Sequence, residues 1–359
     1  MTEAAPARSA HLSERVEVAR KPLPSQLELA QSISQGSRPH VYFFYRMRRF
    51  ATVILLLLAC AVSRAQKPPA KSQSATDSDT TLKVDVKLVN VYVTVTDPKG
   101  SPVAGLKKEN FALQEDGHLQ TISVFDKESA LPLSIALAID TSLSTRHDLP
   151  LEQASAKRFA HAIMRPVDAL SVFGFSETVL QATSYTPDLR RIDDGIDHIR
   201  LGAATALFDA VYLASRSLDR RQGRKVMVLI TDGGDTISKV DYQEAARAAE
   251  EAEALVYSII VVPIENSAGR ETGGEHALIQ LSEDTGGKYY YATSVSQLDD
   301  AFRQISDELR NQYLLAYYSS QRTSNSVFRR IQVAVSGPAD ASSYHVRHRT
   351  GYYTVKSDF

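Results

Sequence analysis

The sequence predicts an α/β fold: a doubly wound, mostly parallel sheet inserted into a small β-sandwich that the flanking segments form. In the middle of the chain, runs rich in β-branched and aromatic residues alternate with helical patterns. This alternation is typical of a parallel sheet covered by helices on both faces. On either side, apolar and polar residues alternate with a period of two between turn signals, which is typical of antiparallel strands.

The composition sets the broad class of the protein. The chain has 359 residues, which favours two or three domains, and its 43% hydrophobic and 23% charged residues are ordinary for a globular protein. The formal net charge of -1 creates no global field that would attract nucleic acid. Cys60 is the single cysteine, so an internal disulfide and a thiolate zinc site are both excluded.

The region before residue 82 is predicted to serve export. Residues 47–65 join a basic start, a short apolar run and Ser63-Arg64-Ala65, which is the pattern of a secretory signal peptide cleaved after Ala65. The apolar run is shorter than the roughly 17–25 residues that span a membrane. Residues 1–46 are interpreted as a misassigned or disordered extension before Met47. Residues 66–81 are rich in Lys, Pro and Ser, and we expect a flexible linker.

An alternative interpretation concerns Cys60 itself. The run Leu57-Leu58-Ala59-Cys60 resembles a bacterial lipoprotein signal, in which Cys60 would carry the lipid. A membrane anchor is expected only in that case. The mature protein is otherwise predicted to be exported to the periplasm, the cell surface or the medium.

The first flanking segment, residues 82–130, is predicted to form strands. Leu82 to Val95 alternates, but the phase changes near Val89-Asn90, which predicts a bulge or bend there. Residues 97–100 form a turn signal, and 115–117 a hairpin signal between strands at 111–113 and 122–125.

The second flanking segment, residues 312–355, contributes predicted strands at 313–318, 330–335 and 344–347. Neither segment has enough strands for a stable sandwich of its own, so we expect the two to pair. Pairing would also bring together the two ends of the inserted domain. The tyrosines at 317, 318, 352 and 353 are interpreted as packing residues of this sandwich, with a ligand surface as the alternative.

The inserted domain spans residues 131–311 and contains five predicted strands and five predicted helices. The strands are Leu133–Ile139, Ala169–Phe175, Lys225–Ile230, Ala254–Val262 and Lys288–Ala292. The helices are Leu151–Met164, Leu207–Leu218, Tyr242–Glu253, His276–Glu283 and Gln297–Asn311.

Oxygen-bearing side chains follow the ends of these strands. Asp140, Ser142 and Ser144 form a D-x-S-x-S run directly after the first strand, and its alternation turns the three side chains to one side. Thr205 precedes a helix, and Asp232 follows a later strand. Ligand crevices of open α/β sheets lie at such positions. Mg²⁺ binds about six oxygens and usually keeps some of its waters. The five oxygen-bearing side chains therefore predict a site for a hard divalent cation.

This pattern resembles the metal-ion-dependent adhesion site of von Willebrand factor type A domains. The surrounding sequences Ala-Thr-Ala-Leu-Phe-Asp-Ala and Val-Leu-Ile-Thr-Asp-Gly are also similar to that family, and the flanking segments resemble those of acidobacterial proteins built around such a domain. The resemblance implies an antiparallel edge hairpin at residues 176–185. It also implies that a ligand carboxylate can shift the last helix, here residues 296–312.

The resemblance further implies a division of roles. Ser142, Ser144 and Thr205 would bind Mg²⁺, or alternatively Mn²⁺ or Ca²⁺, through their hydroxyls. Asp140 and Asp232 would hold metal-bound waters. An Asp or Glu carboxylate of a protein partner would complete the coordination. Two neighbouring residues, Asp209 and Asp235, are candidates for hydrogen bonding around the site, with helix-start and turn roles as their alternatives.

The resulting functional prediction is an exported, non-enzymatic adhesion or scaffolding protein. A metal-dependent hydrolase is one alternative, but Gly174 to Thr178 lacks the closing glycine of G-x-S-x-G, and no H-E-x-x-H pair occurs. Nucleotide binding is disfavoured because no G-x-G-x-x-G or phosphate-binding loop is present. A structural module of the cell envelope with a vestigial site is the remaining alternative.

Overall fold

The computed structural model describes residues 88–127, 131–145, 149–232, 234–262, 272–321, 326–337 and 343–354. All of them belong to one compact unit, residues 82–359. The predicted extension, signal peptide, linker and Cys60 lie outside the described residues. Within the described ranges, no helix has the length and apolar character needed to cross a membrane.

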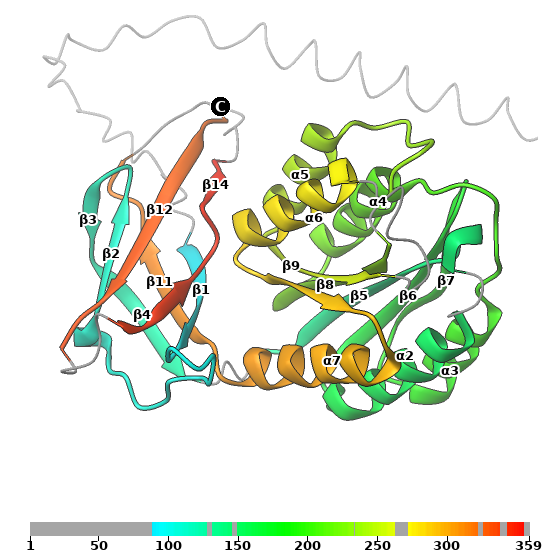
Figure 1. Ribbon diagram of the computed structural model, residues 1–359. Coiled ribbons are helices and arrows are strands. Elements are labelled where there is room, and N and C mark those ends of the chain that lie inside the picture. Colours follow the sequence, from blue (N-terminus) through cyan, green and yellow to red (C-terminus); the bar gives the residue numbers. More distant parts are fainter. Residues whose placement is uncertain are drawn as a thin grey trace, which may run out of the picture. The chain divides into compact units, whose positions relative to one another are not determined.

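A six-stranded sheet forms the centre of the inserted domain (Figure 1), in the order β10-β9-β8-β5-β6-β7. All neighbouring pairs are parallel except β6 and β7, which are antiparallel. The predicted fold class and the predicted edge hairpin are therefore confirmed. The strands are β5 (Leu133–Asp140), β6 (Ala169–Phe175), β7 (Val179–Thr186), β8 (Arg224–Thr231), β9 (Ala254–Val261) and β10 (Lys288–Ala292).

Helices cover both faces of this sheet (Figure 1). One face carries α2 (Leu149–Ile163), α3 (Leu189–His198) and α7 (Val295–Arg310). The other face carries α4 (Leu207–Asp219), α5 (Tyr242–Glu251) and α6 (Thr272–Thr285). Five of these helices correspond to predicted ones, whereas α3 was not predicted.

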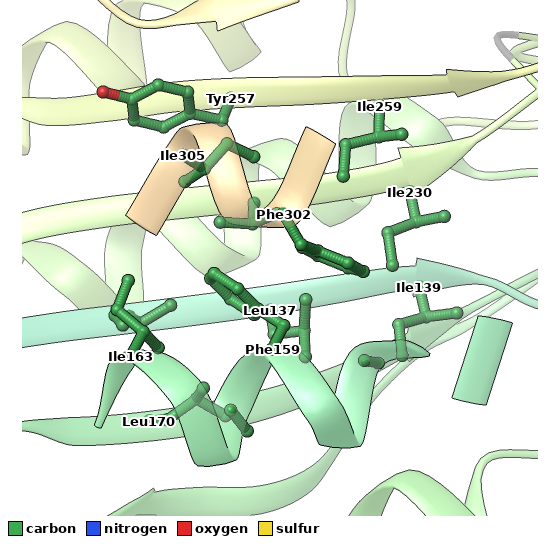
Figure 2. Close-up of a cluster of buried hydrophobic side chains, with 14 of the residues drawn as sticks. Leu137, Ile139, Phe159, Ile163, Leu170, Ile230, Tyr257, Ile259, Phe302 and Ile305 are labelled. Carbon is green, nitrogen blue, oxygen red and sulfur yellow. The ribbon is translucent and has the colours of Figure 1, made fainter. Parts of the chain in front are cut away.

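The core on the α2 and α7 side is built around two aromatic rings (Figure 2). Phe159 of α2 and Phe302 of α7 stack with ring centroids 4.5 Å apart and an interplanar angle of 19°. Leu137 and Ile139 of β5 belong to the same cluster and are fully buried. This packing fixes the strand that ends at Asp140.

The flanking segments form two four-stranded antiparallel sheets, in the orders β13-β1-β11-β4 and β14-β12-β2-β3. In each sheet a strand from before the inserted domain pairs with one from after it: β1 with β11 and β2 with β12. The predicted sandwich is therefore confirmed. Its strands are β1 (Leu88–Thr96), β2 (Phe111–Glu115), β3 (His118–Gln120), β4 (Ile122–Lys127), β11 (Tyr313–Tyr318), β12 (Phe328–Val335), β13 (His345–Arg347) and β14 (Gly351–Tyr353).

The predicted bulge near Val89-Asn90 is wrong for the described part of β1. The strand pairs with β11 from Leu88 to Val93 without a register shift. Val89, Val91 and Val93 share one buried face, and Leu88 lies on the opposite face, so no extra residue is needed. Residues 82–87, which supplied the other phase, lie outside the described residues.

Two of the four tyrosines pack inside the sandwich, as interpreted. Tyr317 and Tyr352 are buried, and both hydroxyls donate hydrogen bonds to Glu115, at 2.6 and 3.0 Å. These bonds satisfy a carboxylate that is itself fully buried. In contrast, Tyr318 is exposed.

The hairpin signal at residues 115–117 is confirmed, but the second strand of the hairpin is β3, which was not predicted, whereas the predicted strand at 122–125 is β4 of the other sheet. The β2–β3 hairpin supports a test of the fold. Asp116 and Gly117 form its two-residue turn with φ values of 48° and 79°. A Cβ at Gly117 would meet no atom, so Gly117→Ala should cost only the backbone strain, about 1 kcal/mol of unfolding free energy in urea titration. The matched control is Gly273→Ala in α6, where a Cβ also meets nothing and φ is not left-handed, and it should not destabilise. Equal losses from the two substitutions would contradict the turn assignment.

Candidate metal centre

Asp140 ends β5 and is fully buried. Its Oδ1 accepts a hydrogen bond from the Ser142 backbone N–H at 2.9 Å, and its Oδ2 accepts one from the Thr231 hydroxyl at 2.7 Å. Burial and, to a smaller extent, the charge of Asp232 raise the pKa of Asp140 to about 6, although the hydrogen bonds from Ser142 and Thr231 oppose this. Burial therefore disfavours the charged form of Asp140, and a nearby cation would offset this cost.

The run after Asp140 is folded into a short turn. Thr145 donates its hydroxyl to the Ser142 carbonyl at 3.0 Å and closes the 3-10 turn η2 (Leu143–Thr145). Thr141 donates both its backbone N–H and its hydroxyl to the Phe175 carbonyl, at 2.8 and 3.0 Å. Ser142 is buried, and Ser144 lies within η2, although its side chain lies outside the described part. The turn is thus bound to the end of β6.

The loop that carries Thr205 is attached to the same edge of the sheet. The Gly202 N–H donates to the Thr141 carbonyl at 2.8 Å, and the Ala206 N–H donates to the Ser176 carbonyl at 2.7 Å. Thr205 is buried between these two anchors, directly before α4. Its position is therefore set by the ends of β5 and β6.

Asp232 reaches this edge from β8, which lies parallel to β5 with Ile230 opposite Ile139. Asp232 follows Thr231 directly and is half-buried. The segment beyond it is bound to the Thr205 loop by two hydrogen bonds. The Thr236 backbone N–H donates to the Thr205 carbonyl at 2.9 Å, and the Thr205 backbone N–H donates to the Thr236 hydroxyl at 2.9 Å. The loop after β5, the loop between α3 and α4 that carries Thr205, and the loop after β8 are therefore joined by hydrogen bonds.

Asp209 and Asp235 connect α4 to the segment after β8. Asp235 accepts from the Phe208 N–H at 3.3 Å and from the Ser238 hydroxyl. Asp209 accepts from the Lys239 and Val240 N–H groups at 2.9 and 3.0 Å. The two carboxylates therefore hold the start of α4 against the segment after β8, which is a structural role.

The donor chemistry at this edge fits a hard divalent cation. Hydroxyl and carboxylate oxygens are ligands that Mg²⁺ and Ca²⁺ take, whereas a structural zinc site requires His or Cys. Within the part of the chain that the structure describes, no cluster of three or more His, Cys, Asp or Glu side chains has metal-binding geometry. A mixed set of serine, threonine and aspartate oxygens is therefore the arrangement to consider.

Sequence analysis missed the residues that hold the loops together. Thr231 lies in the Val-Leu-Ile-Thr-Asp-Gly motif, and its position directly before Asp232 was the signal that could have indicated its hydrogen bond to Asp140. Glu177 had no such signal: its Oε2 accepts from the Ala203 N–H at 2.8 Å, across 26 residues of sequence. A Cβ on Gly202 would overlap the Glu177 carboxylate and the Ser176 hydroxyl, so only glycine fits there without a shift.

Gly202→Ala should therefore weaken metal binding without unfolding the protein. The added methyl group must displace either the segment leading to Thr205 or the side chains of Ser176 and Glu177 that contact it. Disturbing groups that orient metal ligands typically costs about 10–100-fold in affinity. Calorimetric titration with Mn²⁺ measures the effect. The remote Gly273→Ala variant serves as the control and should bind as the wild type does; a wild-type affinity for Gly202→Ala would contradict the expected role of this loop.

Comparison with known proteins identifies the inserted domain. Residues 134–304 match the family model of the von Willebrand factor type A domain. The chain contains a VWA domain. This match lies inside the predicted span of residues 131–311, and the predicted resemblance is confirmed. No curated protein matches the sequence significantly.

Solved structures of VWA proteins resemble the chain at low identity. Protein BatB from Bacteroides thetaiotaomicron is 19% identical, with 49% of this chain and 98% of that chain covered and a TM-score of 0.41. The vWF domain of the type V pili tip protein Mfa5 from Porphyromonas gingivalis is 11% identical, with 49% and 94% covered and a TM-score of 0.40. A von Willebrand factor type A protein from Catenulispora acidiphila is 9% identical, with 75% and 74% covered and a TM-score of 0.45.

Proposed function

We propose that the VWA domain binds Mg²⁺, with Mn²⁺ or Ca²⁺ as substitutes, and captures an acidic side chain of a protein partner. Ser142, Ser144 and Thr205 would hold the ion through hydroxyls, and Asp140 and Asp232 would hold its waters. The observation that carries the proposal is the buried Asp140 carboxylate within three hydrogen-bonded loops.

The charges around the centre support metal dependence. Asp140, Asp232 and Glu177 are acidic groups of these loops, and without a cation they would repel an acidic partner. A bound divalent ion with neutral hydroxyl ligands would reverse the sign of the local field and offer a position to an external carboxylate. A chelator should therefore remove partner binding rather than merely weaken it.

Binding fits the described contacts better than catalysis does. The hydroxyls of Thr231, Thr141 and Thr145 each donate to a carboxylate or a carbonyl, so they stabilise the loops rather than serve as activated nucleophiles. Together with the signal pattern at residues 47–65, this supports an exported adhesion or scaffolding protein rather than an enzyme.

The test is calorimetric titration of the chain with Mg²⁺ and Mn²⁺, for the wild type and for Ser142→Ala. We expect one site per chain and an affinity at least about tenfold lower in the variant, because a hydroxyl ligand is lost. Pull-down from a cell-envelope extract should recover the partner with Mg²⁺ and not with chelator.

Two other outcomes would favour the alternatives. No metal binding, and no anomalous density in crystals soaked with Mn²⁺, would indicate a structural module with a vestigial site. Metal-dependent turnover of ester or phosphate substrates that is lost in Asp140→Ala would indicate a hydrolase.

A further inference from the structure

Three large aliphatic side chains are exposed on the loops of the candidate metal centre. Leu143 is 55% exposed, Leu201 43% and Ile237 52%. Leu143 lies in η2, between two of the proposed ligands. We call these three side chains the apolar rim.

Each member of the rim is attached to the centre by the backbone. Leu201 directly precedes Gly202, whose N–H donates to the Thr141 carbonyl at 2.8 Å. The Ile237 N–H donates to the Thr205 carbonyl at 3.3 Å. The side chains therefore extend from all three of the loops that hold the proposed ligands, although the first and last of them, Leu143 and Ile237, are far apart along the chain.

Single exposed leucines are common on protein surfaces and need no explanation. Here, however, an aliphatic group occurs on every loop of one polar centre, where water would otherwise compete with an incoming carboxylate. Burying such groups against a partner removes apolar area from water, which is favourable. In protein interfaces, the residues that contribute most of the binding free energy are surrounded by contacts that exclude water. Exclusion of water also strengthens the attraction between an ion and a carboxylate.

We infer that the apolar rim docks a partner segment in which one acidic residue is flanked by large apolar side chains. This inference rests on the proposed function. The acid is matched by the metal, and the flanking side chains are matched by the rim. Further acids beside the first would face Glu177, Asp232 and the aliphatic rim, so a polyacidic segment does not fit.

Labelled, capped pentapeptides with a central aspartate test this in the presence of Mn²⁺. One probe has leucines on both sides of the aspartate, one has glycines and one has further aspartates. Fluorescence polarisation should show at least about tenfold tighter binding of the leucine-flanked probe than of the other two. Removal of Mn²⁺ should abolish binding of all three.

Substitutions then locate the preference. Leu143→Ser, Leu201→Ser and Ile237→Ser should each lower the affinity for the leucine-flanked probe several-fold, while the affinity for Mn²⁺ and for the glycine-flanked probe stays unchanged. Leu119→Ser is the matched control, because Leu119 is 71% exposed but lies on β3 of the sandwich.

The outcomes distinguish failure of this inference from failure of the proposed metal-dependent binding. If the wild type binds Mn²⁺ but holds the glycine-flanked or polyacidic probe as tightly as the leucine-flanked one, the rim has no role and the proposed function stands. If the rim variants lose Mn²⁺ affinity as well, the side chains support the loops and the inference is overturned. If the wild type binds no Mn²⁺, both proposals fail.

Discussion

Asp140→Asn is expected to lower the affinity for Mn²⁺ by about 100-fold or more. The substitution keeps the shape of the side chain and the Oδ1 acceptor for the Ser142 N–H, but it removes a charge. At about 4 Å and an effective dielectric constant of about 20, one unit charge interacts with another by about 4 kcal/mol, and each 1.4 kcal/mol is about tenfold in affinity. A 100-fold loss corresponds to about 2.8 kcal/mol, which is less than this interaction.

Calorimetry with Mn²⁺ measures the loss, and the far-ultraviolet circular dichroism spectrum should remain unchanged. Thr231→Val is the matched control: it removes the hydrogen bond of 2.7 Å to Asp140 and preserves the charge. Its effect should be intermediate, about tenfold. Asp140→Asn with wild-type affinity would show that the buried carboxylate serves the fold and that the ion, if any, binds elsewhere.

The metal-free form provides a second measurement on the same variant. A buried carboxylate beside another acidic residue costs free energy in the absence of a cation, and a neutral amide of the same shape avoids most of that cost. We therefore expect Asp140→Asn to leave the unfolding free energy unchanged, or to raise it, when chelator is present. A site selected for binding at the expense of stability would behave in this way.

The α/β architecture was predictable because its local signals agree with its packing. Strand β5 is an uninterrupted apolar run that is buried along its whole length, and the helices begin near recognisable caps such as Asp241. In contrast, α3 was missed. Its polar run and Gly195 hide the apolar spacing of Leu189, Ile192 and Ile196, although Asp188 caps it by accepting from the Arg190 N–H at 3.0 Å.

Long-range contacts explain what the sequence did not reveal. The basic residues Arg220, Arg221 and Arg224 follow one another closely, a pattern typical of a solvated helix end, but Arg224 does not fit that pattern. The residue is buried, and its guanidinium donates to the Leu309 carbonyl at 2.7 Å and to the Gln312 side chain. These partners lie more than 80 residues away, so no local pattern identifies them. The candidate metal ligands could be picked out along the sequence, but the hydrogen bonds that join their loops could not.

Breaking a similar long-range pair, Arg347 with Glu308, should have the largest effect on stability. Nη2 of Arg347, in β13, lies 2.5 Å from Oε2 of Glu308, in α7, and the Glu308 side chain is only 7% exposed. Glu308 also accepts hydrogen bonds from the hydroxyls of Tyr257 and Thr94, at 2.8 and 3.2 Å. Arg347→Met leaves this carboxylate buried without its cation, and such a loss costs about 3–5 kcal/mol. Because Arg347 is 27% exposed and the hydroxyl donors remain, we expect the lower end, about 3 kcal/mol.

Urea unfolding of two further variants separates the charge from the packing. Arg347→Met combined with Glu308→Gln removes the unpaired charge but keeps an acceptor for Tyr257 and Thr94, so at least half of the lost stability should return. Arg158→Met is the surface control, because the Arg158–Asp299 pair is 53% and 39% exposed and should contribute less than about 1 kcal/mol. A loss from Arg347→Met no greater than that of the control would contradict the expected role of the pair.

The Arg347–Glu308 pair also connects the sandwich to the VWA domain. Arg347 belongs to the sandwich, whereas Glu308 lies in the last turn of α7, the last helix of the VWA domain. Gln312 extends the connection by donating to the Thr94 hydroxyl at 3.0 Å. Buried polar bonds that cross from one part to the other make their unfolding cooperative. The wild type should therefore unfold in one transition, and Arg347→Met should broaden it or divide it in two. A variant that loses stability but still unfolds in one sharp transition would show that the covalent junctions and apolar packing are sufficient for cooperativity.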